Sequence, residues 1–376
     1  MELIFWGSIL LIFHAYFGYP LTLLVITRVR EKPVRKMPHF PPATLIIAAC
    51  NEEKRIHEKL VNTLALDYPS EQLQVIVVSD GSTDATNNIV MEYAEHGIEL
   101  LALPERRGKE HAQKEAVTRA SGEIIIFSDS STRIVSGSLK EITANFADPS
   151  VGCVSSVDQV LGQDGRPSGE GFYVRYEMWL RNLESRVNSL VGLSGSFFAA
   201  RKEVCRDFSG EMQSDFRTVL NSMKLGLRGV NDPAAIGSYQ DISDSRKEFE
   251  RKVRTVLRGL TVFFRNLEFL NIFRYGLFAY QYFCHKLLRW LVPIFLFAAL
   301  GSNLWLAFHS YIYLVIFIGH FCFYGIALWA WFQKVSPEKS AVKIPLYFLV
   351  VNAAILTAWW QYLRGDRMIM WSPTER

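Results

Sequence analysis

The sequence has few cysteines, and none of them forms a closely spaced pair. Its 376 residues contain five cysteines, with no C-x-x-C spacing. Zinc sites and disulfide frameworks both need clustered or paired cysteines, so neither is predicted, and the chain fits a reducing compartment. The five are Cys50, Cys153, Cys205, Cys284 and Cys322.

Two glycine-rich signatures are also missing. There is no Walker A lysine loop and no G-x-G-x-x-G after a strand, which excludes the P-loop and dinucleotide-binding classes. The net charge of +4 is small for a chain of this length, so no nucleic-acid partner is predicted.

The sequence is rich in apolar residues. Hydrophobic residues make up 49% and aromatic residues 13%, which indicates a membrane component. Leu3–Ile26 is an apolar run too long for the core of a signal peptide, without a basic start or a cleavage site, so residues 1–27 are predicted to be a transmembrane helix. The basic and proline-rich linker 28–43 follows, which predicts that this end of the helix is cytoplasmic.

Three more spans are predicted within residues 290–376. Each is about 20 residues long, as a hydrocarbon core of ~30 Å requires. Lysines before the last span place that loop in the cytoplasm. Because one span follows the loop, the C-terminus would then lie outside, whereas Arg364 and Arg367 favour the inside. Both topologies stay open. The spans are Trp290–Phe308, Tyr311–Trp331 and Ile344–Leu363, and the lysines are Lys334, Lys339 and Lys343.

Between the spans, strands alternate with helices. Short runs rich in β-branched residues at Thr44–Ala49, Leu73–Val78 and Ile124–Phe127 read as buried strands, and helical segments separate them. This order predicts an α/β fold with a mostly parallel, doubly wound sheet, in one domain covering residues 44–246. Each run ends in acidic and hydroxyl residues, and ligands of such sheets lie outside the carboxyl ends of the strands.

Residues 247–289 are predicted to form basic and interfacial helices. Lys247, Arg251, Arg254 and Arg258 fall on one helix face, which reads either as a solvated face or as a site for a diphosphate or lipid headgroups. Leu260–Phe283 is rich in aromatic residues but interrupted by charges, which is typical of a helix lying in the membrane interface.

The polar residues at the strand ends suit a particular chemistry. Asp80, Asp84 and Asp129 could hold Mg²⁺ or Mn²⁺ together with a ribose or diphosphate, because these cations prefer carboxylate, hydroxyl and phosphate oxygens. Lys109 lies in a glycine-containing turn where it could meet phosphate as a point charge. Asp215 lies outside this cluster and is free to act as a general base toward a hydroxyl.

At these residues the chain resembles the membrane-integrated family 2 glycosyltransferases, whose catalytic domain has the A-type glycosyltransferase fold. Ile47–Glu53 is similar to the family's I-P-A-Y-N-E-E, and Ser79–Asp84 to its D-D-G-S-T-D. Tyr173–Glu177 is similar to Y-x-R-Y-E, and Gly192–Gly195 to G-x-x-G. The catalytic motif corresponds to Ser214–Phe216.

The resemblance implies roles for individual residues. Nucleotide contacts fall to Ala49, Asn51, Glu52, Asp80, Lys109 and Ser130; metal contacts to Asp129 and Ser131; and acceptor or diphosphate contacts to Gly192, Ser194, Gly195, Arg251 and Arg254. Asp215 is implied to be the catalytic base.

The sequence departs from the family pattern at two places. The metal motif D-x-D appears as Asp129-Ser130-Ser131, so a hydroxyl replaces the second carboxylate. Arg251 and Thr255 replace the glutamine and tryptophan of the family's Q-x-x-R-W, which lines the polymer end in processive synthases. Transfer of a single sugar is therefore favoured over polymerisation.

The resemblance implies an inverting transfer from a nucleotide sugar, expected to be a UDP-sugar, to a lipid-linked or glycan acceptor. The expected location is a bacterial inner membrane with the catalytic domain in the cytoplasm, and a homo-oligomer or other glycan-assembly proteins are further expected partners. Two alternatives remain: a processive polysaccharide synthase, and a membrane scaffold that binds nucleotide sugar without catalysis.

Overall fold

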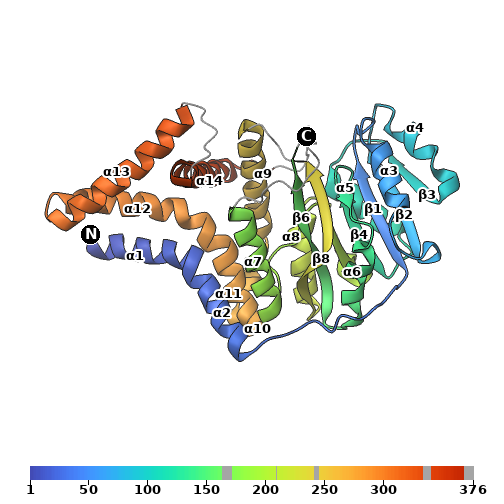
Figure 1. The fold of residues 1–376 in the computed structure, drawn as a ribbon, viewed down its shortest axis with the longest axis horizontal. Coiled ribbons are helices and arrows are strands. Elements are labelled where there is room, and N and C mark those ends of the chain that lie inside the picture. The colour runs from blue at the N-terminus through green and yellow to red at the C-terminus, as the bar shows by residue number, and fades with distance from the viewer. Residues whose placement is uncertain (163–171, 209, 241–244, 333–339, 368–376) are drawn as a thin grey trace. The chain divides into compact units, whose positions relative to one another are not determined.

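The computed structural model describes residues 1–162, 172–208, 210–240, 245–332 and 340–367. The chain forms two compact units (Figure 1). The membrane unit comprises Met1–Thr22, Ser243–Leu270 and Ala279–Arg367, and the sheet unit comprises Leu23–Ile242 with Asn271–Phe278. The predicted lysine-bearing loop at 333–339 and the tail after residue 367 lie outside the described residues.

The sheet unit is built on an 8-stranded sheet in the order β3-β2-β1-β4-β7-β6-β8-β5. The first four of these pair in parallel, β7 is antiparallel to both β4 and β6, and β8 is parallel to β6. The strands are β1 (Ala43–Ala49), β2 (Leu73–Asp80), β3 (Ile98–Leu103), β4 (Ile124–Asp129), β5 (Arg133–Ile134), β6 (Val151–Leu161), β7 (Phe197–Arg201) and β8 (Arg228–Gln240). The predicted α/β class with a mostly parallel sheet is confirmed.

Helices connect these strands along the chain. They are α3 (Ile56–Leu64), α4 (Thr86–Met91), α5 (Lys109–Arg119), α6 (Ser138–Ala144), α7 (Phe172–Val187) and α8 (Ser214–Lys224). The helical segment after β2 is divided: α4 ends at Met91, and a separate 3₁₀ turn spans Ala94–His96.

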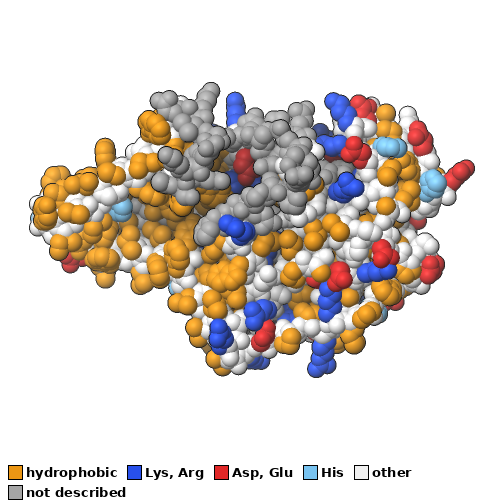
Figure 2. Space-filling view, viewed as in Figure 1, with side chains coloured by type: hydrophobic (Ala, Val, Ile, Leu, Met, Phe, Trp, Pro, Cys, Tyr) orange, Lys and Arg blue, Asp and Glu red, His pale blue; other side chains and the backbone are white. Residues whose placement is uncertain are grey.

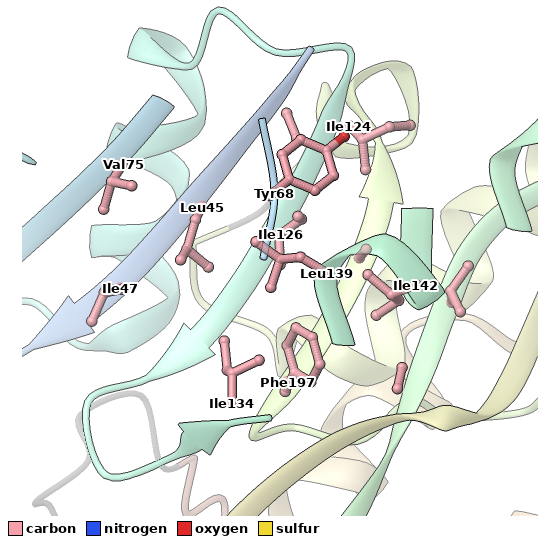
Figure 3. Close-up of a cluster of buried hydrophobic side chains, with 14 of the residues drawn as sticks. Leu45, Ile47, Tyr68, Val75, Ile124, Ile126, Ile134, Leu139, Ile142 and Phe197 are labelled. Carbon is pink, nitrogen blue, oxygen red and sulfur yellow. The ribbon is translucent and has the colours of Figure 1, made fainter. Parts of the chain in front are cut away.

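The core of the sheet unit consists of aliphatic and aromatic side chains from one face of the sheet and the helices against it. Leu45, Ile47, Val75 and Ile126 are buried on adjacent strands, and Leu139 and Ile142 of α6 pack on the same cluster (Figure 3). Burying such side chains contributes roughly 1.5–3 kcal/mol each. This core fixes the register of the strands, and the register places the strand ends that carry the polar residues.

The second half of the sheet has features that the sequence conceals. β8 contains Pro233 and two glycines, residues that are uncommon inside strands. Its register with β6 shifts between Ser155 and Val157, where Asn231 and Ile236 are the successive partners. The segment carrying Pro233 therefore bulges out of the ladder, which explains how a proline is accommodated.

The membrane unit contains helices long and apolar enough to cross a membrane. In the described residues there are 4 such helices: Glu2–Val29, Leu277–Ala307, Tyr311–Phe332 and Ile344–Leu363. Within them lie α1 (Glu2–Phe13), α2 (Tyr19–Val29), α11 (Leu277–Tyr282), α12 (Arg289–Ala307), α13 (Tyr311–Phe332) and α14 (Ser340–Leu363). Figure 2 shows hydrophobic side chains gathered on the face of these helices, as expected of surface that contacts lipid.

Two of the long helices contain π-helical segments, His14–Gly18 and Phe283–Leu288. His14 lies in the first, and its Nε2 is 3.1 Å from the hydroxyl of Tyr280. A polar group at membrane depth needs such a partner, because lipid offers none. His14 is therefore satisfied inside the helix bundle.

The segment Leu260–Phe283, expected as one interfacial helix, is divided in the structure. It contains the end of α9 (Ser245–Phe264), the short helix α10 (Ile272–Tyr275) and the start of the helix that runs on to Ala307. Asn271 caps α10 by accepting from the backbone N–H of Phe273, and Gly276 ends it with a φ of 52°. These two residues mark the ends of α10 and so divide the segment into separate helices.

Candidate active site

The parallel strands deliver polar residues to one edge of the sheet. The register places Ala48 of β1 beside Asp129 of β4, and Ala49 beside Ser79 of β2. Asn51 follows β1 with a φ of 54°, a left-handed conformation that asparagine tolerates better than most residues. Its side-chain oxygen accepts from the backbone N–H of Thr83 at 2.9 Å. The turns after β1 and β2 are thus joined.

Asp80, at the end of β2, holds the basic turn Arg106–Lys109. Its two carboxylate oxygens accept from the backbone N–H groups of Arg107 and Gly108, both at 2.8 Å. Next to it, Gly81 has a φ of 61°, and a Cβ there would lie 2.5 Å from the Arg106 nitrogen. Only glycine allows so close an approach. The turn that carries Lys109 is therefore fixed against the segment Asp80–Asp84.

Lys109 connects three parts of the site. It is the first residue of α5, and its Nζ forms an ion pair with Asp129 and donates to the carbonyl of Gly195 at 3.0 Å. The Lys109 and Asp129 side chains are 13% and 22% exposed, so water screens this pair only partly. A charged, partly exposed lysine at this edge can meet an anion.

The Gly192–Ser196 loop brings Asp215 to the same place. The backbone N–H of Leu193 donates to the carbonyl of Asp215 at 3.3 Å, and Gln213 donates to its Oδ2 at 3.2 Å. A Cβ on Gly195 would lie 3.3 Å from that Oδ2. Asp215 is in the first turn of α8, where the helix dipole favours an ionised carboxylate. Asp215, Gly195, Lys109 and Asp129 are therefore contiguous.

Gly195→Ala is expected to slow turnover by about tenfold or more, because the added methyl group pushes on the Asp215 carboxylate, and small displacements of a reacting group are costly. The measurement is the rate of nucleotide release at saturating donor. Gly137→Ala is the matched control, since no atom lies within 4 Å of its Cβ position. Equal rates for the two variants would contradict the expectation.

A buried lysine that the sequence analysis does not single out binds the residues on either side of the segment Asp129–Ser131. Lys59 of α3 is 3% exposed, and its Nζ donates to Ser128 Oγ at 2.7 Å and to the carbonyl of Thr132 at 2.6 Å. Burial lowers the pKa of Lys59 to about 7, and the negative charge of Asp129 opposes that shift. The two bonds bracket residues 129–131. Nothing in the sequence distinguishes this lysine from a surface position on an amphipathic helix.

The residues present fit a divalent cation only when a substrate completes its coordination. In the described part of the chain, no three His, Cys, Asp or Glu side chains are grouped as a metal site. Asp129 supplies one carboxylate and Ser131 a hydroxyl. Mg²⁺ commonly binds through one or two carboxylates plus substrate phosphates, so this set is sufficient with a diphosphate. A cation at Asp129 would displace Lys109 from its ion pair.

The remaining predicted residues lie in different surroundings. Ala49 and Ser130 are buried at the ends of β1 and β4, and Glu52 is buried and paired with Arg55 at 2.8 Å. Arg251 and Arg254 lie on α9 in the membrane unit. Arg251 pairs there with Glu248; burial alone would raise the pKa of Glu248, but hydrogen bonds and charges from Arg251 and Lys252 lower it to about 2.

This arrangement defines a class of protein. The fold is that of the A-type glycosyltransferases, as the likeness to a solved structure shows. A mannosyltransferase from Pyrobaculum calidifontis, solved with GDP-Man and Mn²⁺, superposes with a TM-score of 0.72 over 97% of this chain and 100% of its own, at 22% identity. At that identity the likeness concerns the fold.

The family follows from the sequence of the same unit. Residues 44–208 match glycosyl transferase family 2, so this part of the chain is a domain of that family. In the part of the chain that the structure describes, four helices are long and apolar enough to cross a membrane, which indicates a membrane protein.

Two curated relatives match part of the chain at similar identity. A beta-monoglucosyldiacylglycerol synthase from Nostoc sp. is 24% identical over 61% of this chain and 50% of its own length. A poly-beta-1,6-N-acetyl-D-glucosamine synthase from Staphylococcus aureus is 27% identical over 60% of this chain and 54% of its own. The chain therefore spans about half the length of the curated relatives it matches.

Proposed function

We propose that the protein transfers a sugar, with inversion, from a nucleotide sugar to a lipid-linked or glycan acceptor at the cytoplasmic face of a bacterial inner membrane. The observation that carries the proposal is the contiguity of Asp215, Gly195, Lys109 and Asp129 at the carboxyl end of the sheet. The site thus joins an anion-binding lysine to a carboxylate base, the two functions that this transfer needs.

In the proposed mechanism Asp215 accepts the proton of the acceptor hydroxyl as that oxygen attacks the anomeric carbon. The bond to the diphosphate breaks at the same carbon, and the ammonium of Lys109 stabilises the charge that develops on the leaving group. Mg²⁺ or Mn²⁺, held by Asp129 and the Ser131 hydroxyl, would supply further charge neutralisation when bound. Asn51 and Asp80 are proposed to contact the nucleotide, since they shape the neighbouring turns.

A UDP-sugar remains the first expectation for the donor. The fold neighbour solved with GDP-Man makes GDP-sugars the necessary comparison. The relatives named for a glucosyldiacylglycerol and for a polymer of N-acetylglucosamine support both glycolipid and glycan acceptors. The second relative also keeps a processive synthase as the alternative, and product length separates the two: a ladder on a gel indicates polymerisation, and a single product indicates one transfer.

The test is nucleotide release by the purified, detergent-solubilised chain against a panel of UDP- and GDP-sugars. Each sugar is offered with diacylglycerol or short glycan acceptors, in Mn²⁺, in Mg²⁺ or in EDTA. Release from one nucleotide sugar, abolished by EDTA, is the expected result. Nucleotide binding without release from any sugar would instead support a non-catalytic scaffold.

A further inference from the structure

An aspartate outside the predicted site holds the loop that joins its parts. Asp158 lies on β6, in the stretch Val157–Leu161 that pairs with β8 beyond the bulge. Its Oδ1 accepts a hydrogen bond from Ser194 Oγ at 2.6 Å and another from Ser196 Oγ. The two serine hydroxyls are also 3.0 Å from each other. One carboxylate oxygen therefore ties together the residues on both sides of Gly195.

The sheet topology explains why this loop is central. Because β7 runs antiparallel to both β4 and β6, the loop that precedes β7 lies between the carboxyl end of β4 and the middle of β6. On the β4 side, the carbonyl of Ser196 accepts from the backbone N–H of Asp129 at 2.9 Å. On the β6 side, the backbone N–H of Ser194 donates to Ser155 Oγ at 2.8 Å.

Gly195, at the centre of the loop, contacts the two side chains with proposed chemical roles. Its carbonyl accepts from Lys109 at 3.0 Å, and a Cβ added to it would lie 3.3 Å from Oδ2 of Asp215. Glycine has the greatest backbone freedom of all residues, so the loop needs restraints from its neighbours. Ser194 and Ser196 are 1% and 9% exposed, and hydrogen bonds from hydroxyls to a carboxylate are stronger than neutral ones.

We propose that Asp158 is a positioning residue of the transferase: through Ser194 and Ser196 it fixes Gly195 between Lys109 and Asp215. The inference rests on the proposed function, because it assumes that Asp215 is the base. Asp158 itself does not take part in proton transfer. Its carboxylate oxygen acts as a fixed acceptor, and its negative charge is secondary.

Two substitutions separate position from charge. Asp158→Asn keeps an oxygen that can accept both serine hydroxyls but removes the charge. Asp158→Ala removes the acceptor altogether. A positioning role predicts that Asn retains turnover within about threefold and that Ala lowers kcat by about 10- to 100-fold, with the donor KM within about threefold of the original. A double Ser194→Ala, Ser196→Ala variant should match Asp158→Ala, and adding it to Asp158→Ala should cost little more.

Hydrogen exchange gives a second measurement that needs no substrate. Backbone amides of residues 193–197 should exchange several-fold faster in Asp158→Ala than in the unchanged protein or in Asp158→Asn. The chain offers a matched pair at the other end of β6, where Ser150 Oγ donates to Asp148 Oδ1 at 2.7 Å. Asp148→Asn and Ser150→Ala are the controls, and neither should change kcat or the exchange of 193–197.

Several outcomes would overturn the proposal. If Asp158→Asn loses as much kcat as Asp158→Ala, the charge acts directly and Asp158 is catalytic. If Asp158→Ala leaves both kcat and exchange unchanged, the loop does not depend on it. Failure of the proposed function is distinguishable: either the unchanged protein releases nucleotide from no sugar, or Asp215→Asn keeps full turnover, while the exchange results at 193–197 still report on Asp158.

Discussion

Asp215→Asn should lower the rate of sugar transfer by a factor on the order of 10²–10⁴, the range that a general base typically contributes. The amide that replaces the carboxylate has nearly the same shape but cannot accept the proton of the acceptor hydroxyl. Gln213 Nε2 donates to Oδ2, and Asn can place its side-chain oxygen there to accept that bond, so the first turn of α8 should be preserved. Rates of nucleotide release and the affinity for free nucleotide are the two measurements.

A large fall in rate with little change in nucleotide affinity is the result that identifies a base. Because Asp215 lies beyond the strand ends that carry Asn51 and Asp80, nucleotide affinity should stay within about threefold. Asp67→Asn is the control, an exposed carboxylate of the same unit that pairs with Lys140 at 2.5 Å. If affinity and turnover fell by the same factor, Asp215 would be a donor ligand, and the base would have to be sought elsewhere.

Asp129→Asn is expected to cost about 10²-fold or more in turnover and to abolish stimulation by Mn²⁺ or Mg²⁺. Two effects combine. The variant removes the single carboxylate of the metal motif, and it leaves the ammonium of Lys109, only 13% exposed, without its ionic partner. Stability should therefore be followed alongside activity, by thermal unfolding in detergent, so that loss of fold is not mistaken for loss of chemistry.

Ser131→Asp provides the opposite change, since it restores the second carboxylate of D-x-D. It should lower the metal concentration that gives half-maximal activity by about tenfold. Full activity of the unchanged protein in EDTA would contradict both expectations, and it would mean that Lys109 alone neutralises the leaving diphosphate.

Strands β1, β2 and β4 could be predicted from sequence because they are buried on both faces. Continuous β-branched runs such as Leu73–Val78 have no common alternative once turn residues bound them. β8 could not be found in this way, because Pro233 and the glycines disguise a strand whose bulge accommodates them. The strand order could not be predicted either, because no local sequence pattern indicates that β7 inserts between β4 and β6.

The residues of the candidate site also fall into two groups, those that the sequence indicates and those that only the structure reveals. Asn51, Asp80 and Asp129 stand in recognisable motifs directly after predicted strands, and their proposed roles stay predictions. Asp158 and Lys59 act through contacts made across the sheet, with partners 36 and 69 residues away in the chain for the bonds to Ser194 and Ser128. Such pairings follow from topology, and a single sequence without its topology gives no reason to single these residues out.

The strand order also has a consequence for how the chain is made. β1 to β4 come from one continuous stretch, Ala43–Asp129, so this half of the sheet can assemble on the ribosome before β7 emerges. Until then β4, with its run Ile124–Phe127, is an open edge, and open apolar edges invite pairing with other chains. Insertion of β7 protects the nascent protein from aggregation in the same step that completes the active-site loop.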